Sequence, residues 1–157
     1  MSSSNTKNPT MQKIDSLNQV AAFHRLFKHP ILDNPTIPAK ERADLRVRLI
    51  AEELDELKEA IANNDMIEVA DALCDIQYVL SGAVLEFGLG DKFVKLFEEV
   101  QRSNMSKACT NMEEVEASIA HYKNVKGEEC TYRKEGDKYL LFRTCLLYTS
   151  PSPRDRG

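Results

Sequence analysis

The feature that most constrains this chain is a pair of long helical patterns joined by a very short turn, Asn63-Asn64-Asp65. Residues 39–63 and 66–87 repeat apolar side chains at three- and four-residue steps, which is typical of amphipathic helices. Asparagine and aspartate favour turns, and Asp65 is placed to cap the second helix. Because so short a turn leaves no room for a crossover, the sequence predicts that the two helices pack antiparallel.

The flanking segments extend this pattern into a small helical protein. Further helices are expected over about 16–29, 92–105 and 112–122, and the run CTYRKEGDKYLLFRT reads as two β-rich segments around a glycine turn. The predicted fold class is therefore all-α: an antiparallel helical bundle of four to five helices with a small C-terminal β-hairpin. We expect a disordered tail over 1–13, the helical domain over 14–125 and the hairpin extension over 126–144.

The last thirteen residues, CLLYTSPSPRDRG, follow neither a helical nor a strand pattern. They resemble the translation of a transposase adapter used in sequencing libraries. We therefore expect residues 145–157 to be non-native and leave them out of the fold, with the native C-terminus lost beyond about Thr144. The alternative is a natural disordered tail rich in proline and serine.

Composition excludes several function classes. The formal net charge of −4 argues against a nucleic-acid partner, whose binding proteins are usually basic. No apolar run approaches the roughly 20 residues of a membrane span, so no membrane partner is expected. The polar N-terminus lacks a signal-peptide pattern, which predicts a cytoplasmic location. The four cysteines form no CxxC pair, so a zinc or disulfide scaffold is not expected, and Cys74 is predicted as a small core residue.

Acidic residues are concentrated in the two long helices. The run from Glu52 to Asp75 holds nine of them. With about 100° between successive residues, Glu53 falls within the apolar face of the first helix and Glu56 lies at its edge. Glu68, Asp71 and Asp75 form a stripe along the border of the next helix, and Gly82 continues that stripe without a side chain, leaving room for another group. Folding the helices together would bring four carboxylates to one place: Glu53, Glu56, Glu68 and Asp71.

Half-buried carboxylates that lie together repel one another and resist ionisation, and a divalent cation relieves both effects. Oxygen ligands without histidine or thiol favour Mg²⁺ or Mn²⁺. The alternative is that these acids line an ordinary solvated face and that Glu68 closes a capping box with Asp65. A carboxylate di-iron site is disfavoured because no histidine follows a glutamate by three residues, and no EF-hand loop is present.

The acidic motifs resemble those of a known superfamily. EELDE, from Glu52 to Glu56, is followed by EVAD, from Glu68 to Asp71, and later by RSNMSK, residues 102–107. This order and spacing is similar to the all-α nucleoside triphosphate pyrophosphohydrolases, which include MazG-like proteins, dimeric dUTPases and phosphoribosyl-ATP pyrophosphohydrolase. The resemblance covers about Val20 to Lys107.

The resemblance implies hydrolysis of a nucleoside triphosphate substrate between its α and β phosphates by a helical homodimer or homotetramer. It implies that Mg²⁺ is held by Glu53, Glu56, Glu68 and Asp71. Glu52 would bind a second ion or orient the attacking water, and Asp75 would support the metal from its outer shell. Positive and polar groups would hold the pyrophosphate and the base; the candidates are Arg102, Asn104, Lys107 and His24.

Other roles stay open for several of these residues. Arg102 and Lys107 could simply offset the dipole at a helix end. Arg46 and Arg48 could pair with the acids or reach a phosphate. Phe23 and Tyr78 could belong to the core or to a base pocket.

Two other functions stay open for the chain as a whole. The first is a non-catalytic nucleotide- or metal-binding helical oligomer that acts as a sensor or interaction partner. The second is a structural bundle whose acids face water. Phosphoribosyl-ATP is a related alternative substrate, and the base preference is not fixed by the sequence.

Overall fold

The structure is a computed structural model that describes residues 9–143. The suspected non-native tail over 145–157, and most of the N-terminal tail predicted over 1–13, lie outside the described residues. The chain divides into two compact units between Phe93 and Val94, and each is considered separately. The domain bounds predicted at residues 125 and 126 stay a prediction.

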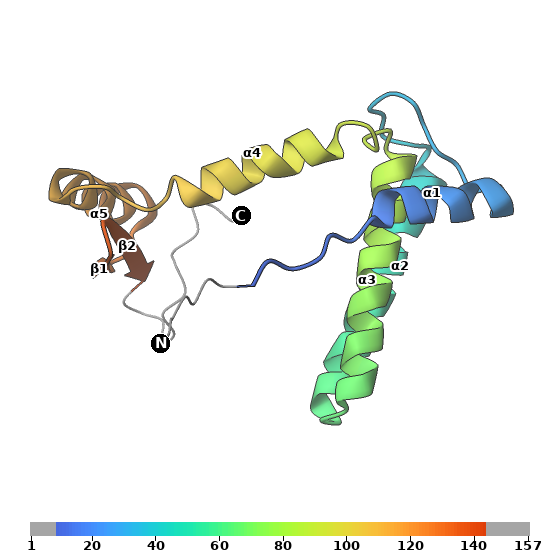
Figure 1. The fold of residues 1–157 in the computed structure, drawn as a ribbon, viewed down its shortest axis with the longest axis horizontal. Coiled ribbons are helices and arrows are strands. Elements are labelled where there is room, and N and C mark those ends of the chain that lie inside the picture. The colour runs from blue at the N-terminus through green and yellow to red at the C-terminus, as the bar shows by residue number, and fades with distance from the viewer. Residues whose placement is uncertain (1–8, 144–157) are drawn as a thin grey trace, which may run out of the picture. The chain divides into compact units, whose positions relative to one another are not determined.

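The first unit consists of three helices, α1 (Ser16–Phe27), α2 (Lys40–Ala62) and α3 (Met66–Glu86). α2 and α3 lie side by side and run antiparallel, and α1 packs across α3 (Figure 1). The turn between α2 and α3 contains Asn64 at φ 52°, and the Asp65 side chain accepts a hydrogen bond from the Glu68 backbone N–H at 3.1 Å. The predicted turn and cap are therefore confirmed.

The loop between α1 and α2 docks on the C-terminal end of α3. The Leu32 N–H donates to the Leu85 carbonyl at 3.1 Å, and the Thr36 N–H donates to the Phe87 carbonyl at 3.0 Å. Gly88 has φ 73°, and a Cβ there would lie only 1.9 Å from the Asn34 carbonyl oxygen. The loop can approach this closely only because residue 88 is glycine.

A buried ion-pair cluster joins α2 to α3. Glu86 is 1% exposed and accepts two hydrogen bonds from Arg42, at 2.7 and 2.9 Å. It accepts a third from Nε of Arg46 at 2.6 Å, and Arg46 is itself only 5% exposed. These contacts hold the pKa of the Glu86 carboxyl below its usual value despite the opposing effect of burial. The carboxylate therefore stays ionised and ties two charged residues of α2 to the end of α3.

Gly82 provides the space that this cluster needs. A Cβ on Gly82 would lie 2.8 Å from Nη1 of Arg46 and 3.1 Å from Nε2 of His24. His24 is 3% exposed, and its Nδ1–H donates to the Pro30 carbonyl at 2.9 Å. The groups that approach the glycine on the acid stripe are thus parts of the protein itself, the Arg46 guanidinium and the His24 ring.

Replacing Gly82 with alanine is expected to lower the free energy of unfolding. Overpacking costs about 1–3 kcal/mol, which exceeds the gain of about 1 kcal/mol from a better helix former. Urea unfolding of the Gly82→Ala protein measures the difference. The exposed Ala70→Gly change on the same helix calibrates the helix-propensity part, and a Gly82→Ala protein more stable than wild type would contradict the packing described here.

The second unit contains α4 (Phe93–Met105), α5 (Met112–Lys126) and a hairpin of β1 (Cys130–Glu135) and β2 (Lys138–Arg143). The strands are antiparallel, with Cys130 opposite Arg143 and Glu135 opposite Lys138. α5 packs on the hairpin around a small core of Cys109, Val115, Tyr122 and Leu141. No residue of α4 is buried.

The described residues thus confirm the predicted all-α class, with five helices and a C-terminal hairpin. α5 ends four residues later than predicted, at Lys126, because Gly127 adopts φ 66° and its N–H donates to the Tyr122 carbonyl as a C-cap. The core prediction for Cys74 is wrong, since the residue is exposed on α3. No helix in residues 9–143 is long and apolar enough to cross a membrane.

Candidate metal centre

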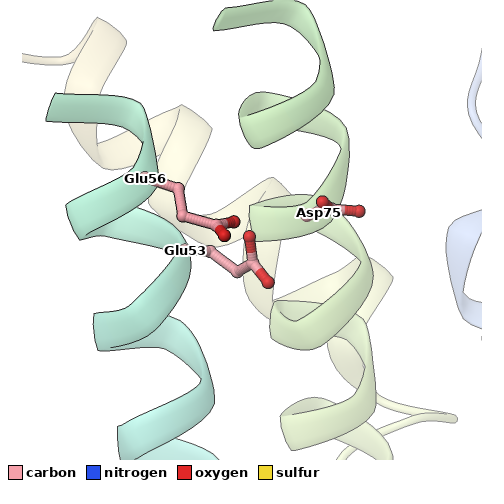
Figure 2. Close-up of side chains that lie close together, drawn as sticks. All are labelled: Glu53, Glu56 and Asp75. Atoms are coloured by element: carbon pink, nitrogen blue, oxygen red, sulfur yellow. The ribbon is translucent and has the colours of Figure 1, made fainter. Parts of the chain in front are cut away.

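Three carboxylates meet between α2 and α3. Glu53 and Glu56 extend from α2, and Asp75 extends from the facing helix α3 (Figure 2). One carboxylate oxygen from each lies within 4.8 Å of the other two. Glu53 and Glu56 share a face because they are three residues apart, and the antiparallel packing of α2 and α3 brings Asp75 opposite them.

The electrostatics of this group are unfavourable for free carboxylates. A hydrogen bond with Glu56, burial and the charges of Asp75 and Asp71 raise the pKa of Glu53 from 4.5 to about 7. Burial, followed by the charges of Asp71 and Glu56, also raises the pKa of Asp75. Oε2 of Glu53 is buried and has no hydrogen-bond partner among the described residues. The group therefore holds an unsatisfied acceptor and excess negative charge.

This combination fits a divalent cation. A hard cation would supply the partner that Oε2 of Glu53 lacks, and it would offset the mutual repulsion that raises these pKa values. The donor set consists only of carboxylate oxygens, as hard cations prefer. The acids of α2 and α3 thus form a candidate metal centre.

The remaining predicted acids lie at different distances from this group. Asp71 is adjacent, since it hydrogen-bonds Asp75 and its charge acts on Glu53. Glu68 is not part of the group, and its N–H serves the Asp65 cap. Glu52 is exposed, and its Oε1 lies 4.0 Å from Nε of Arg48. The ligand role of Glu68 and the catalytic role of Glu52 stay predictions.

Asp75 occupies a more central place than the sequence indicated. The family resemblance favoured Glu68 and Asp71 as ligands and gave Asp75 an outer role, whereas the structure places Asp75 in the group itself. The signal that favours Asp75 was present, since it lies one turn beyond Asp71 on the same stripe. The sequence pattern does not predict the register of α2 against α3, which decides which acid of the stripe faces Glu53 and Glu56.

The raised pKa of Glu53 predicts a pH dependence of stability in metal-free buffer. The folded protein keeps this proton to about pH 7, whereas the unfolded chain releases it near 4.5. Between these values the folded state binds more protons, so the free energy of unfolding falls as pH rises. We expect a loss of about 1–2 kcal/mol, since water screens a partly exposed group. Urea unfolding in EDTA between about pH 4 and about pH 8 measures it. The Glu53→Gln protein should lack this loss, and an identical slope in both would contradict the assignment.

An aromatic cluster lies beside the acids in the same unit. Phe23 contacts Phe27, His29 and Tyr78, with the Tyr78 ring edge-on at 5.7 Å between centroids. Phe23 and Tyr78 are 38% and 41% exposed, so both present part of a ring to solvent. Tyr78 follows Asp75 by three residues on α3 and therefore lies one turn away from it. His24, by contrast, is buried against the scaffold, and its predicted ligand contact stays a prediction.

The other predicted substrate contacts belong to the second unit. Arg102 pairs with Glu99 through two hydrogen bonds, at 2.6 and 2.9 Å, and both side chains are mostly exposed. Such a pair adds little stability and leaves the guanidinium accessible. Asn104 and Lys107 line a cavity of this unit. Arg46, which the sequence allowed to pair with the acids or reach a phosphate, pairs instead with Glu86.

Comparison with known proteins places the helices that carry these acids in a known family. The family described as phosphoribosyl-ATP pyrophosphohydrolase matches residues 20–104, which is 85 of the 157 residues and includes the acids of α2 and α3. An uncharacterized protein of Acanthamoeba polyphaga mimivirus is 31% identical over 109 residues, which cover 64% of this chain and 41% of that protein. The chain therefore spans about two fifths of the length of this relative. By the family match, the chain belongs to the phosphoribosyl-ATP pyrophosphohydrolase family.

Proposed function

We propose that the protein hydrolyses a nucleoside triphosphate between the α and β phosphates, in a Mg²⁺-dependent reaction that yields a monophosphate and pyrophosphate. Removing unwanted nucleotides from the cellular pool is the role we assign to it. The observation that carries the proposal is the group of Glu53, Glu56 and Asp75, with its unsatisfied buried oxygen, inside the segment that matches the family.

In this proposal Glu53, Glu56 and Asp75 hold the ion, and Asp71 and Glu68 complete or support its shell. When bound, Mg²⁺ neutralises phosphate oxygens and lowers the pKa of a bound water. Glu52 lies next to this group in sequence and is exposed, so we assign it the positioning of the attacking water and the acceptance of its proton. Mn²⁺ is expected to substitute, since it prefers the same oxygen ligands.

The aromatic cluster is the proposed contact for the base. A partly exposed ring can stack on a planar heterocycle, and Phe23 and Tyr78 supply such rings one turn from Asp75. We assign His24 a supporting role at this surface, because its ring lies 5.4 Å from that of His29, which in turn stacks on Phe23. For Arg102, Lys107 and the Asn104 amide, all in the second unit, we keep the predicted role of phosphate contacts.

The exposed apolar side chains of α2 and α3 support a homodimer or homotetramer. Ile61, Met66, Ile67 and Leu73 are each more than half exposed. Several large apolar side chains exposed on two packed helices favour a contact with another chain.

The proposed reaction is tested by pyrophosphate release from a panel of canonical and modified nucleoside triphosphates, with phosphoribosyl-ATP included. Each is assayed with Mg²⁺, with Mn²⁺ and with EDTA. We expect release that depends on the metal and differs between bases. Binding of a nucleoside triphosphate without pyrophosphate release would favour the non-catalytic alternative and contradict the proposal.

A further inference from the structure

The second unit has a cavity of its own. It has a volume of about 720 Å³ and lies between the end of α4, one side of α5 and strand β2. All the residues that line it lie between Asn104 and Leu141. Small-molecule sites commonly have volumes of about 300–1,000 Å³. The cavity is thus large enough for a small organic molecule, and it contains none of the acids of the metal centre.

One part of the cavity wall is apolar. Tyr122 and Leu141 are buried members of the core of this unit and also line the cavity, next to Met105 and Leu140. The core holds the Tyr122 ring in place, and the Lys126 ammonium lies over it at 5.8 Å from the ring centroid. A fixed aromatic ring beside aliphatic side chains is suited to a planar or apolar part of a ligand.

The polar part of the wall contains two lysines. Lys107, Lys126 and the imidazole of His121 line the cavity, together with the hydroxyls of Ser106 and Ser118. Glu114 is the acid in this lining, but its carboxylate already accepts hydrogen bonds from the backbone N–H and the hydroxyl of Thr110. Two lysines and one carboxylate give the lining a formal net charge of about +1, which complements an anion.

We propose that this cavity binds a small organic phosphate, with the phosphate at the two lysines and a planar group against Tyr122 and Leu141. A nucleoside monophosphate combines both parts. The proposal deepens the proposed function in one respect, because Asn104 and Lys107 are also its predicted substrate contacts. The other contacts of the phosphate and of the planar group come from α5 and β2. Neither element belongs to residues 20–104, the segment that matches the family.

Isothermal titration of the full chain with adenosine 5′-monophosphate in EDTA tests this inference. We expect saturable binding without metal. Loss of one charge-assisted contact should weaken it about 10-fold or more in Lys107→Gln and in Lys126→Gln. Lys123→Gln is the matched control, since Lys123 lies on the same last turn of α5 but does not line the cavity, and it should bind like wild type.

Three comparisons separate this site from the metal centre and from simple phosphate binding. Glu53→Gln should bind the monophosphate as wild type does even where pyrophosphate release is lost, and loss of binding in that variant would overturn the proposal. Inorganic phosphate and adenosine should each bind at least about 10-fold more weakly than the monophosphate, because each lacks one of its two groups. Equal binding of inorganic phosphate, or no binding of the monophosphate to folded wild-type protein, would also overturn it.

Discussion

Replacing Glu53 with glutamine is expected to lower the rate of metal-dependent pyrophosphate release by about 100-fold or more. Glu53 carries the buried oxygen that lacks a partner, and its carboxyl lies against both Glu56 and Asp75. Glutamine keeps the shape but removes the charge that a divalent cation requires. Glu59→Gln is the matched control, since Glu59 is an exposed acid on the same helix outside the group, and it should leave the rate unchanged.

The same substitution should raise stability when no metal is present. The repulsion that raises the pKa of Glu53 disappears in Glu53→Gln, so the variant should resist urea better than wild type in EDTA at about pH 8. Mg²⁺ should then stabilise wild type but not the variant. Lower activity combined with lower stability in EDTA would instead indicate simple damage to the fold and would contradict the role given to Glu53.

Replacing Glu86 with glutamine is expected to lower the free energy of unfolding by about 3–5 kcal/mol. Glu86 is the carboxylate that both Arg42 and Arg46 contact, and Nη2 of Arg46 is buried without another partner in the described chain. Loss of the Glu86 charge would leave the Arg46 guanidinium buried and uncompensated. Asp44→Asn, which breaks an exposed pair with Lys40 on the same helix, should cost less than about 0.5 kcal/mol.

A double substitution separates charge from packing at this cluster. Arg46→Met combined with Glu86→Leu removes both buried charges, and the partly exposed Arg42 can then turn to solvent. We expect the double variant to be more stable than Glu86→Gln alone, because apolar side chains of similar volume often replace a buried ion pair at little cost. Chemical unfolding of wild type, Arg46→Met, Glu86→Leu and the double variant measures the coupling, and strictly additive losses would contradict it.

The helices were predictable because their periodicity and turn residues act locally. Asn63, Asn64 and Asp65 ended one helix and capped the next as their side chains favour, and Pro30 and Gly88 lie in the loops that follow α1 and α3. The end of α5 lies later than predicted because Gly127, and not the end of the apolar pattern, sets it. Local chemistry therefore determines most of the element bounds.

Long-range contacts were less predictable. Leu54 and Ile61 are seven residues apart on α2 and so share one helical face, yet both are exposed in the described chain. A helical pattern shows which residues share a face but not what covers that face. For the same reason, the sequence pattern did not reveal that Glu86 pairs with Arg42 and Arg46. These arginines precede Glu86 by 44 and 40 residues.

The candidate site was predictable in its main residues but not in its register. The spacing of the acids predicted that carboxylates of α2 and α3 come together around a divalent cation. Glu53 and Glu56 do meet an acid of α3. Which acid of the stripe lies opposite them depends on how far one helix slides along the other. That distance is set by the Glu86 cluster and the packing at Gly82, which the spacing of the acids alone does not contain.

The most direct test of the account is ³¹P nuclear magnetic resonance of a nucleoside triphosphate incubated with the full chain and Mg²⁺. The substrate is the one that the panel ranks highest. The account predicts that the signals of monophosphate and pyrophosphate grow together, and that neither appears with EDTA or with Glu53→Gln. Formation of nucleoside diphosphate and inorganic phosphate would contradict cleavage between the α and β phosphates. Equal turnover in EDTA would contradict the metal centre itself.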